Sequence, residues 1–416
     1  MLNSSILKRI VGSRDVKNGS LLGFAHALTL LLGLSTTIVW TRWMPIEIYG
    51  QFKVVMGVIS FAGAFCLLGI GQAALMSASS QADGNLLGLI RKKFQGNLVG
   101  VSLLLIGAGY YYWMRQDTVS LAVGLVAAAF LFPFYNTGDV WAGWLNGKGQ
   151  FIRLAIGRLL ASTLAFFAVL IVILFYVRTV WLAIAILLVM LSLQNVFMLG
   201  RALRLRANEH SDKEIIRFGW HAHFAFGFTS ILALDVLFLE YVHSVEEVAL
   251  YAVALVLPGL LKTIFGIIGQ VVAPKIYATD SPRELWAIFK SKFYWLTFVF
   301  VILGVAGFLA IPIVTPLLFT ERYVASADYA KWLWLTISCV GSFTYLGSAL
   351  LATRREIYLY IPNVGHPVVL MILYFSLVDF GASGMVFAKC ISTLLLAGYY
   401  GAAFCVYLIR GTKASV

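Results

Sequence analysis

Residues 248–272 read VALYAVALVLPGLLKTIFGIIGQVV, and this stretch decides the kind of fold that the chain adopts. It is 25 residues long and contains one charged side chain, Lys262, two residues beyond its midpoint. About 20 apolar residues in a helix cross the hydrocarbon core of a bilayer. The stretch therefore predicts a membrane-spanning helix, and the lysine near its centre needs a physical reason.

Composition extends this interpretation to the whole chain. Of the 416 residues, 61% are hydrophobic and only 12% are charged, and the mean hydropathy is +0.90. A soluble globular protein does not need so much apolar surface. Backbone groups inside lipid are satisfied only in helices or closed barrels, and the apolar runs here are too long and too even for barrel strands. We therefore predict an all-α integral membrane protein.

Hydropathy and periodicity place twelve predicted spans along the chain. They cover residues 20–43, 50–75, 94–114, 119–145, 151–177, 180–200, 216–241, 248–273, 292–314, 327–352, 357–379 and 383–409. The polar, basic N-terminal segment contains no cleavage-like site, so no signal peptide is expected. The four cysteines fall in apolar segments, which predicts small buried thiols and neither disulfides nor a metal site.

The distribution of Lys and Arg predicts the orientation. With the N-terminus in the cytoplasm, 22 basic residues lie in inner segments and four lie in outer ones, namely Arg42, Arg115, Arg178 and Arg322. The positive-inside rule therefore places both termini in the cytoplasm. The net charge of +13 reflects this bias and contact with membrane lipids, so no nucleic-acid partner is expected.

A short internal repeat suggests that the chain consists of two halves. PIEIYGQFKVVM at 45–56 and SVEEVALYAVAL at 244–255 match at an offset of 199, and each leads from an odd-numbered span into the next one. We predict two six-helix bundles, 1–205 and 206–416, around a central cavity. Parallel repeats of this kind are typical of membrane proteins that bind a ligand between their halves.

Small and polar residues share one helical face around Lys262. The members of this face are Gly259, Lys262, Thr263, Gly266 and Gln270, and the opposite apolar stripe consists of Leu257, Leu261, Ile264, Ile268 and Val271. Lys262 lies about 3 Å from the middle of the span at a rise of ~1.5 Å per residue, so its amine reaches the interface with difficulty. The side chain is either neutralised or ion-paired inside the bundle or exposed to a hydrated cationic cavity, and we favour the cavity.

Further charged residues in the spans or at their outer ends are candidates as well. Lys53, Lys389 and Arg42 are candidate cavity cations, although a side chain that simply reaches the interface accounts for Lys53 and Lys389 about as well. Asp235 is the best acidic candidate for a site that binds a proton or a sodium ion, and a structural carboxyl accounts for it equally well. Because bases predominate inside, the interior suits an anionic ligand.

Asp139 and Arg158 flank the inner loop NGKGQ at 146–150. Asp139 comes nine residues before Lys148 and Arg158 comes ten residues after it. Two antiparallel helices joined by this loop bring both side chains to the same depth. We therefore predict a structural ion pair between them.

Several segments resemble a known family. TRWMPIEIYGQFKVV at 41–55 and LGIGQAAL at 68–75 resemble the first two helices of Wzx-type polysaccharide flippases. LDVLFLEYVHSVEEVALYAVALVLPGLLK at 234–262, followed by VVAPKI at 271–276, resembles the same family's seventh and eighth helices. PLLFTERYVASADYAKWL at 316–333 resembles its outer connection before helix ten. The resemblance covers nearly the whole layout, but its motifs are helix-end patterns that do not specify a substrate.

The resemblance implies a member of the multidrug/oligosaccharidyl-lipid/polysaccharide exporter (MOP) superfamily in a bacterial inner membrane. It implies translocation of an undecaprenyl-diphosphate-linked oligosaccharide, such as an O-antigen or capsule repeat unit of lipopolysaccharide or polysaccharide biosynthesis, coupled to H+ or Na+. Association with a glycan polymerase is a further expectation. Flippases of this superfamily commonly place cavity cations on helices one, two and eight. Here Lys53 and Lys262 match helices two and eight, whereas helix one has no central cation.

Two alternative functions are weighed against this one. A multidrug exporter of the same fold takes cationic substrates and needs acidic residues inside, which this chain offers only sparsely. A membrane glycan polymerase or ligase needs catalytic residues in sizeable outer loops, but the predicted outer connections are short. No H-E-x-x-H, P-loop or paired-carboxylate motif is present. We therefore expect no enzyme, no catalytic residues and no cofactor.

Overall fold

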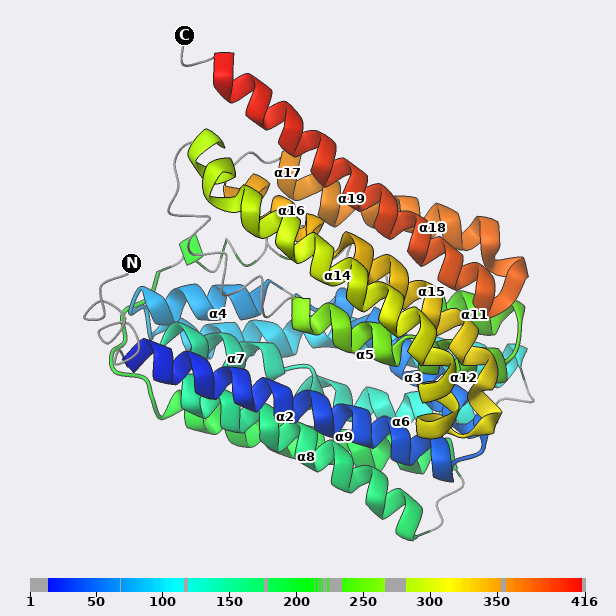
Figure 1. Cartoon of the computed structure of the whole chain (residues 1–416). Helices are drawn as coiled ribbons and strands as arrows, with labels where there is room; N and C mark the ends of the chain where they lie inside the picture. Colours follow the sequence, from blue (N-terminus) through cyan, green and yellow to red (C-terminus); the bar gives the residue numbers. More distant parts are fainter. Residues whose placement is uncertain are drawn as a thin grey trace. The chain divides into compact units, whose positions relative to one another are not determined.

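A computed structural model gives the fold of the chain (Figure 1). It describes residues 14–67, 69–115, 119–175, 179–212, 234–265, 282–352 and 357–413, together with 214, 215, 217, 219 and 223. Among these residues the regular elements are helices, and none is a strand. The chain forms two compact units, Met1–Ser230 and Ile231–Val416. The domain boundary predicted between residues 205 and 206 stays a prediction.

The first unit contains eight described helices, several of which are halves of one span. They are α2 (Arg14–Trp43), α3 (Ile46–Ala64), α4 (Ile70–Ser79), α5 (Asn85–Met114), α6 (Val119–Tyr135), α7 (Gly138–Gly147), α8 (Phe151–Leu174) and α9 (Val180–Leu203). Helix α2 packs along α8, α4 packs on α7, and α6 packs against both α5 and α9 (Figure 1). A core of apolar side chains lies between α4, α5, α7 and α9.

The second unit begins within the described residues at α11. Its helices are α11 (Asp235–Val242), α12 (Val245–Ala254), α14 (Pro282–Phe319), η3 (Glu321–Tyr323), α15 (Val324–Val340), α16 (Phe343–Ala352), α17 (Ile357–Tyr360), η4 (Ile361–Gly365), α18 (His366–Leu377), η5 (Val378–Phe380) and α19 (Gly381–Lys413). Helix α15 packs against α12, α14 and α19, and α18 packs against α19. Element η4 is a π-helix that contains Pro362, so the eleventh predicted span departs from regular α-helix at that point.

The helices fall where the spans are predicted. In the described part of the chain, six segments are long and apolar enough to cross a membrane: Val119–Gly147, Phe151–Leu174, Val180–Leu203, Val245–Phe265, Phe293–Phe319 and Ile361–Ile409. Most of the predicted span 216–241, and the part of span 248–273 beyond Phe265, lie outside the described residues. Span 50–75 is not one continuous helix, because α3 ends at Ala64, a turn follows at Phe65, and α4 begins at Ile70.

Glycines let the two half-helices α4 and α7 cross closely. A Cβ atom at Gly143 would collide with the backbone carbonyl oxygen of Gly71, and one at Gly147 would collide with that of Leu75. Small residues at such crossings allow backbones to approach in membrane proteins. The half-helix α7 of the fourth span is thereby held against the half-helix α4 of the second.

Helix α6 ends at Tyr135 and α7 begins at Gly138, so the fourth span is discontinuous. Side-chain amides from neighbouring helices satisfy the backbone carbonyls that this break releases. Asn97 Nδ2 donates to the carbonyl oxygen of Pro133 at 3.0 Å, and Asn195 Nδ2 donates to that of Tyr135 at 2.6 Å. Irregular backbone at membrane depth is tolerated where protein groups or a cavity satisfy its hydrogen bonds. The break is therefore a candidate location for a functional site.

A buried polar clamp joins the loops at one end of the first unit. Asp83 is fully buried between α4 and α5, and its carboxylate pairs with Lys148 Nζ at 2.6 Å. The same carboxylate accepts the backbone N–H of Ala207 at 2.7 Å. The side chain of Asn85 donates to the carbonyl oxygen of Asp212 at 2.9 Å and accepts its N–H at 3.1 Å. The clamp fixes the chain after α9 to the loop before α5.

Candidate functional site

Lys262 lies in the helix that continues from α12 to Phe265. Leu261 and Phe265 are buried in a core cluster with Phe300 and Tyr345. The Lys262 side chain is exposed. The helix thus turns one side into the protein core and presents the lysine on another.

The two faces predicted for this helix can be compared with the structure up to Phe265. A Cβ atom at Gly259 would meet nothing within 4 Å, and Leu261 is only 4% exposed. Ile264 is 46% exposed, so it does not belong to the protein-packed part of the apolar stripe. Gly266, Ile268, Gln270 and Val271 lie outside the described residues.

Two single cysteine substitutions test whether the helix face that carries Lys262 is hydrated. We expect Gly259→Cys to react with a membrane-impermeant maleimide in intact membranes, because its side chain points into open space one turn from Lys262. Leu261→Cys, at a position that is buried in the native protein, is the matched control and should stay unlabelled. The four native cysteines, Cys66, Cys339, Cys390 and Cys405, are replaced first. Equal labelling at both positions would show that the face of Lys262 does not line water.

Among the described residues no acidic side chain pairs with Lys262. The ionisable groups that interact with it electrostatically are Lys389 on α19 and His366 on α18. Two of these three groups are lysines, and because Lys389 is paired with Asp235, the Lys262 ammonium is the one that no described carboxylate offsets. A site of this kind attracts an anion and offers little to a cation.

Lys389 and Asp235 form an ion pair. The distance between Lys389 Nζ and Asp235 Oδ2 is 2.5 Å, and the aspartate is buried at the start of α11. Tyr251 on α12 donates its hydroxyl to the same oxygen at 2.6 Å, and the Lys389 ammonium lies 5.2 Å from the centre of the Tyr251 ring. The sequence indicated no partner for Asp235, and the structure supplies two. Their proposed roles in substrate binding and ion coupling stay predictions.

Lys53 and Arg42 lie in the first unit. The Lys53 ammonium lies 5.2 Å from the ring centre of Tyr49 and 6.0 Å from that of Phe52, which is cation–π geometry. Among the described residues Lys53 has no acidic partner, and its side chain is half-buried. Arg42 lies exposed in the last turn of α2. Aromatic faces thus support the Lys53 charge without neutralising it.

The predicted pair of Asp139 and Arg158 needs correction. Asp139 Oδ2 pairs with Lys93 Nζ at 2.9 Å, and the fully buried Lys93 also donates to the carbonyl oxygen of Cys66 at 3.0 Å. Arg158 Nη1 lies 2.8 Å from His26 Nε2 on α2. Because arginine only donates, this histidine nitrogen accepts, so His26 carries its proton on Nδ1. Equal depth on two helices does not determine the direction in which each side chain points, and neighbouring helices supplied the partners.

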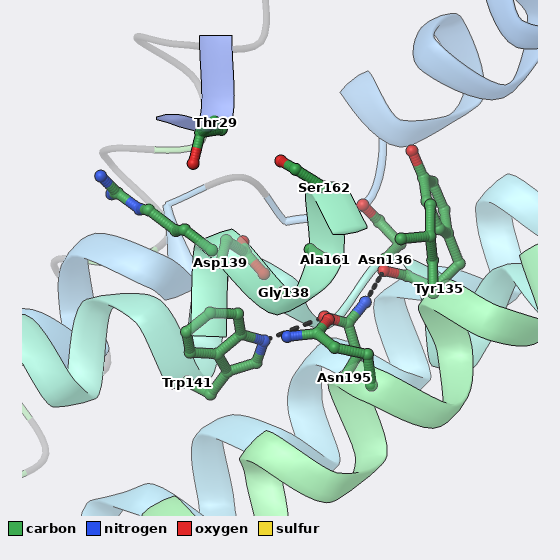
Figure 2. Close-up of a pocket in the computed structure, with 12 residues that line it drawn as sticks. Thr29, Tyr135, Asn136, Gly138, Asp139, Trp141, Ala161, Ser162 and Asn195 are labelled. Carbon is green, nitrogen blue, oxygen red and sulfur yellow. Dashed lines mark hydrogen bonds between the residues drawn. The ribbon is translucent and has the colours of Figure 1, made fainter. Parts of the chain in front are cut away.

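Asp139 and Arg158 nevertheless line one cavity (Figure 2). Its volume is about 460 Å³, and it lies beside the break between α6 and α7. The lining residues are Thr29, Tyr135, Asn136, Gly138, Asp139, Trp141, Arg158, Ala161, Ser162, Leu191, Gln194 and Asn195. Thr29 and Ser162 lie on one side of the space and Trp141 and Asn195 on the other (Figure 2).

Lys93, Tyr251 and the clamp around Asp83 were not among the predicted site residues. Lys93 belongs to the run RKK at 91–93, which has the appearance of an ordinary inner-end basic cluster. Only its fully buried position distinguishes it from its two neighbours. A signal that could have found it is the acidic residue Asp139 in the nearby hairpin, because a carboxylate within a membrane span needs a cation.

Comparison with solved structures shows the fold of the MOP-superfamily transporters, an all-α membrane architecture. An inward-facing multidrug resistance MATE family transporter matches with a TM-score of 0.69 at 15% identity, covering 93% of this chain and 96% of the other. The lipid II flippase MurJ, in an inward closed conformation, matches with a TM-score of 0.74 at 12% identity, covering 94% and 91%. The fold class predicted from the sequence is confirmed.

A third solved structure is a MOP-superfamily transporter from Pyrococcus furiosus, described by a reversed polarity of its binding pocket that suggests a different function. It matches with a TM-score of 0.65 at 14% identity and covers 95% of this chain and 96% of the other. No protein-family model matches the sequence, and no curated protein matches it. The Wzx-type assignment therefore stays a prediction.

Proposed function

We propose that the protein is a flippase that moves an undecaprenyl-diphosphate-linked oligosaccharide from the inner to the outer leaflet of a bacterial cytoplasmic membrane. One observation carries the proposal. Within the described spans, Asp139 and Asp235 are each held by a lysine, whereas Lys53 and Lys262 have no acidic partner among the described residues. Lys53 and Lys262 are thus cations that no described carboxylate offsets, and such charges suit a diphosphate.

The chemistry of the substrate explains why such cations are needed. A lipid diphosphate is negatively charged, and its charge is costly to move through hydrocarbon. A lysine in a hydrated cavity supplies a point charge for phosphate. The lipid tail stays in the bilayer while the headgroup passes through the protein. Coupling to H+ or Na+ and association with a glycan polymerase belong to the same proposal.

Multidrug export is the second candidate, because MATE transporters share the fold. Exporters of cationic drugs need an acidic side chain that is available to the substrate. In the described residues the two clear intramembrane aspartates are paired with lysines, which disfavours this function. The reversed pocket polarity attributed to the Pyrococcus furiosus transporter supports pocket charge as the property that separates functions on this fold.

The test compares two transport assays in a strain that lacks the gene. We expect lipid-linked glycan to accumulate on the cytoplasmic face, where a membrane-impermeant oxidant and amine label does not reach it in intact cells. Expression of the protein should restore labelling from outside and should leave the efflux of cationic dyes unchanged. Normal glycan exposure in the deletion strain, together with dye efflux that depends on the protein, would favour the multidrug exporter.

A further inference from the structure

We propose that the cavity of the first unit binds a sugar ring. The proposal rests on the proposed function only for the source of that sugar, a residue of the lipid-linked glycan. The cavity and its polar groups belong to the first unit, whereas Lys262 and its basic neighbours belong to the second. It is therefore a second ligand site, assigned to the sugar part of a headgroup rather than to its phosphates.

Size is the first argument. A volume of about 460 Å³ far exceeds the ~30 Å³ that a water molecule occupies in the liquid. It falls in the range of about 300–1,000 Å³ that is typical of small-molecule sites. One or two sugar rings fit a space of this size. The break between α6 and α7 forms one wall, and discontinuous helices commonly form ligand sites in transporters.

The second argument is that the residues lining the cavity carry both hydrogen-bond acceptors and donors. Asp139 Oδ1 and Thr29 Oγ1 are buried atoms without a hydrogen-bond partner among the described residues. Arg158 uses one nitrogen on His26, and its guanidinium has further N–H groups. The Ser162 hydroxyl lies on the same side of the cavity as Thr29 (Figure 2). Buried polar atoms of this kind require a partner.

This mixture of hydrogen-bond acceptors and donors indicates which class of ligand fits the cavity. A phosphate needs only donors and would be repelled by the Asp139 carboxylate, whereas a metal ion or drug cation would be repelled by Arg158 and by Lys93 behind Asp139. Each hydroxyl of a sugar both donates and accepts, so it can use a carboxylate, a guanidinium and hydroxyl groups together. Tyr135 and Trp141 add ring surface for the less polar face of the sugar.

Hydrogen bonds within the protein hold the cavity wall opposite Thr29 in place. Trp141 Nε1 donates to Asn195 Oδ1 at 2.9 Å, and Asn195 Nδ2 is used on the carbonyl oxygen of Tyr135 (Figure 2). Gln194 Nε2 donates to the carbonyl oxygen of Gly157 at 3.1 Å. These amides are thus structural. Among the groups left for a ligand are those of Thr29, Asp139, Arg158 and Ser162.

Saturation-transfer NMR on the full-length protein in nanodiscs tests the proposal. The probes are free glucose, galactose, N-acetylglucosamine, rhamnose and glucuronic acid, each with inositol phosphate as a charged comparison. We expect at least one sugar to bind, and Ala161→Leu, which fills the cavity, to reduce its affinity at least tenfold. Ala161→Ser is the matched control and should bind normally. Thr29→Val and Ser162→Ala, which keep the shape, should each weaken binding about fivefold.

Lys262→Ala separates this proposal from the proposed function. It should lose glycan transport and keep sugar binding, because Lys262 lies outside the cavity. Thermal unfolding of each variant verifies folding. If no sugar binds, or if binding persists unchanged in a folded Ala161→Leu variant, the cavity is a structural, solvent-filled space and the proposal is overturned. If inositol phosphate competes at the cavity better than every sugar, the site binds an anion and the proposal is equally overturned.

Discussion

Lys262→Glu should abolish transport of lipid-linked glycan while the protein stays in the membrane at its normal abundance. The substitution places a negative charge where we propose that a diphosphate binds, and like charges in a site cost several kcal/mol. A loss of about 100-fold or more in rate follows from that energy. Lys262→Ala should reduce transport strongly, because it removes the attraction without adding repulsion. Lys262→Arg should retain part of the activity.

The measurement is surface polysaccharide in a complemented deletion strain, together with a membrane blot. Lys331→Glu in the same unit is the matched control, because Lys331 lies on α15 and already pairs with its helix neighbour Asp328 at 2.5 Å. This variant should transport nearly normally. If Lys262→Ala and Lys262→Glu both transport normally at normal abundance, the lysine is incidental. Phosphate binding would then have to be assigned to Lys53, Lys389 or Arg42.

Asp83→Asn should destabilise the first unit by about 2–3 kcal/mol. Removing one partner of a fully buried ion pair costs about 3–5 kcal/mol, and the partial exposure of Lys148 places this case at or below the lower end of that range. The amide keeps a hydrogen-bonding oxygen for Ala207 but loses the charge that Lys148 pairs with. Thermal unfolding in detergent, followed by tryptophan fluorescence, measures the loss.

The contribution of Asp83 should also depend on pH. Burial alone would raise the pKa of Asp83, but bonds from Lys148, Ala207 and Asn208 outweigh it and hold the pKa below its ordinary value of 3.8. The folded state therefore binds this proton less readily than the unfolded chain. The stabilisation is complete above the ordinary pKa and disappears as the pH falls through the lowered one.

The difference in stability between wild type and Asp83→Asn should accordingly shrink in acid. Asp328→Asn makes the same chemical change in an exposed pair, whose aspartate side chain is 70% exposed, and should change stability by less than about 0.5 kcal/mol. If both variants unfold like the wild type, the clamp contributes nothing to stability.

Hydropathy sufficed to predict the helical membrane fold, because long apolar runs have one solution in lipid. The interruptions within the spans were harder to predict from the sequence. The break after Tyr135 lies between Pro133 and Gly138, and proline and glycine are residues that indicate a helix interruption. The turn after Ala64, in contrast, falls in a continuously apolar run. In that turn Leu67 has a φ of 53°, a left-handed conformation that a leucine in the sequence does not predict.

Partners of charged residues were predictable only in part. The spacing around Lys148 predicted an ion pair of Asp139 and Arg158, but the structure gives each another partner, although both line the same cavity. It did not suggest Lys93 or His26, because these come from helices whose rotation about their axes is set by tertiary packing. Asp235 and Lys389 are far apart in the sequence, and no periodicity within either span connects them.

The pairing of Lys389 with Asp235 has a consequence for energy coupling. A carboxylate whose counterion belongs to the same chain meets that counterion at an effective concentration that dilution does not lower. A sodium ion or proton arriving from solution has to displace the ammonium before it binds. If Asp235 is the coupling carboxylate, the side chain of Lys389 acts as an internal competitor, and the ion gradient has to overcome that competition in every transport cycle.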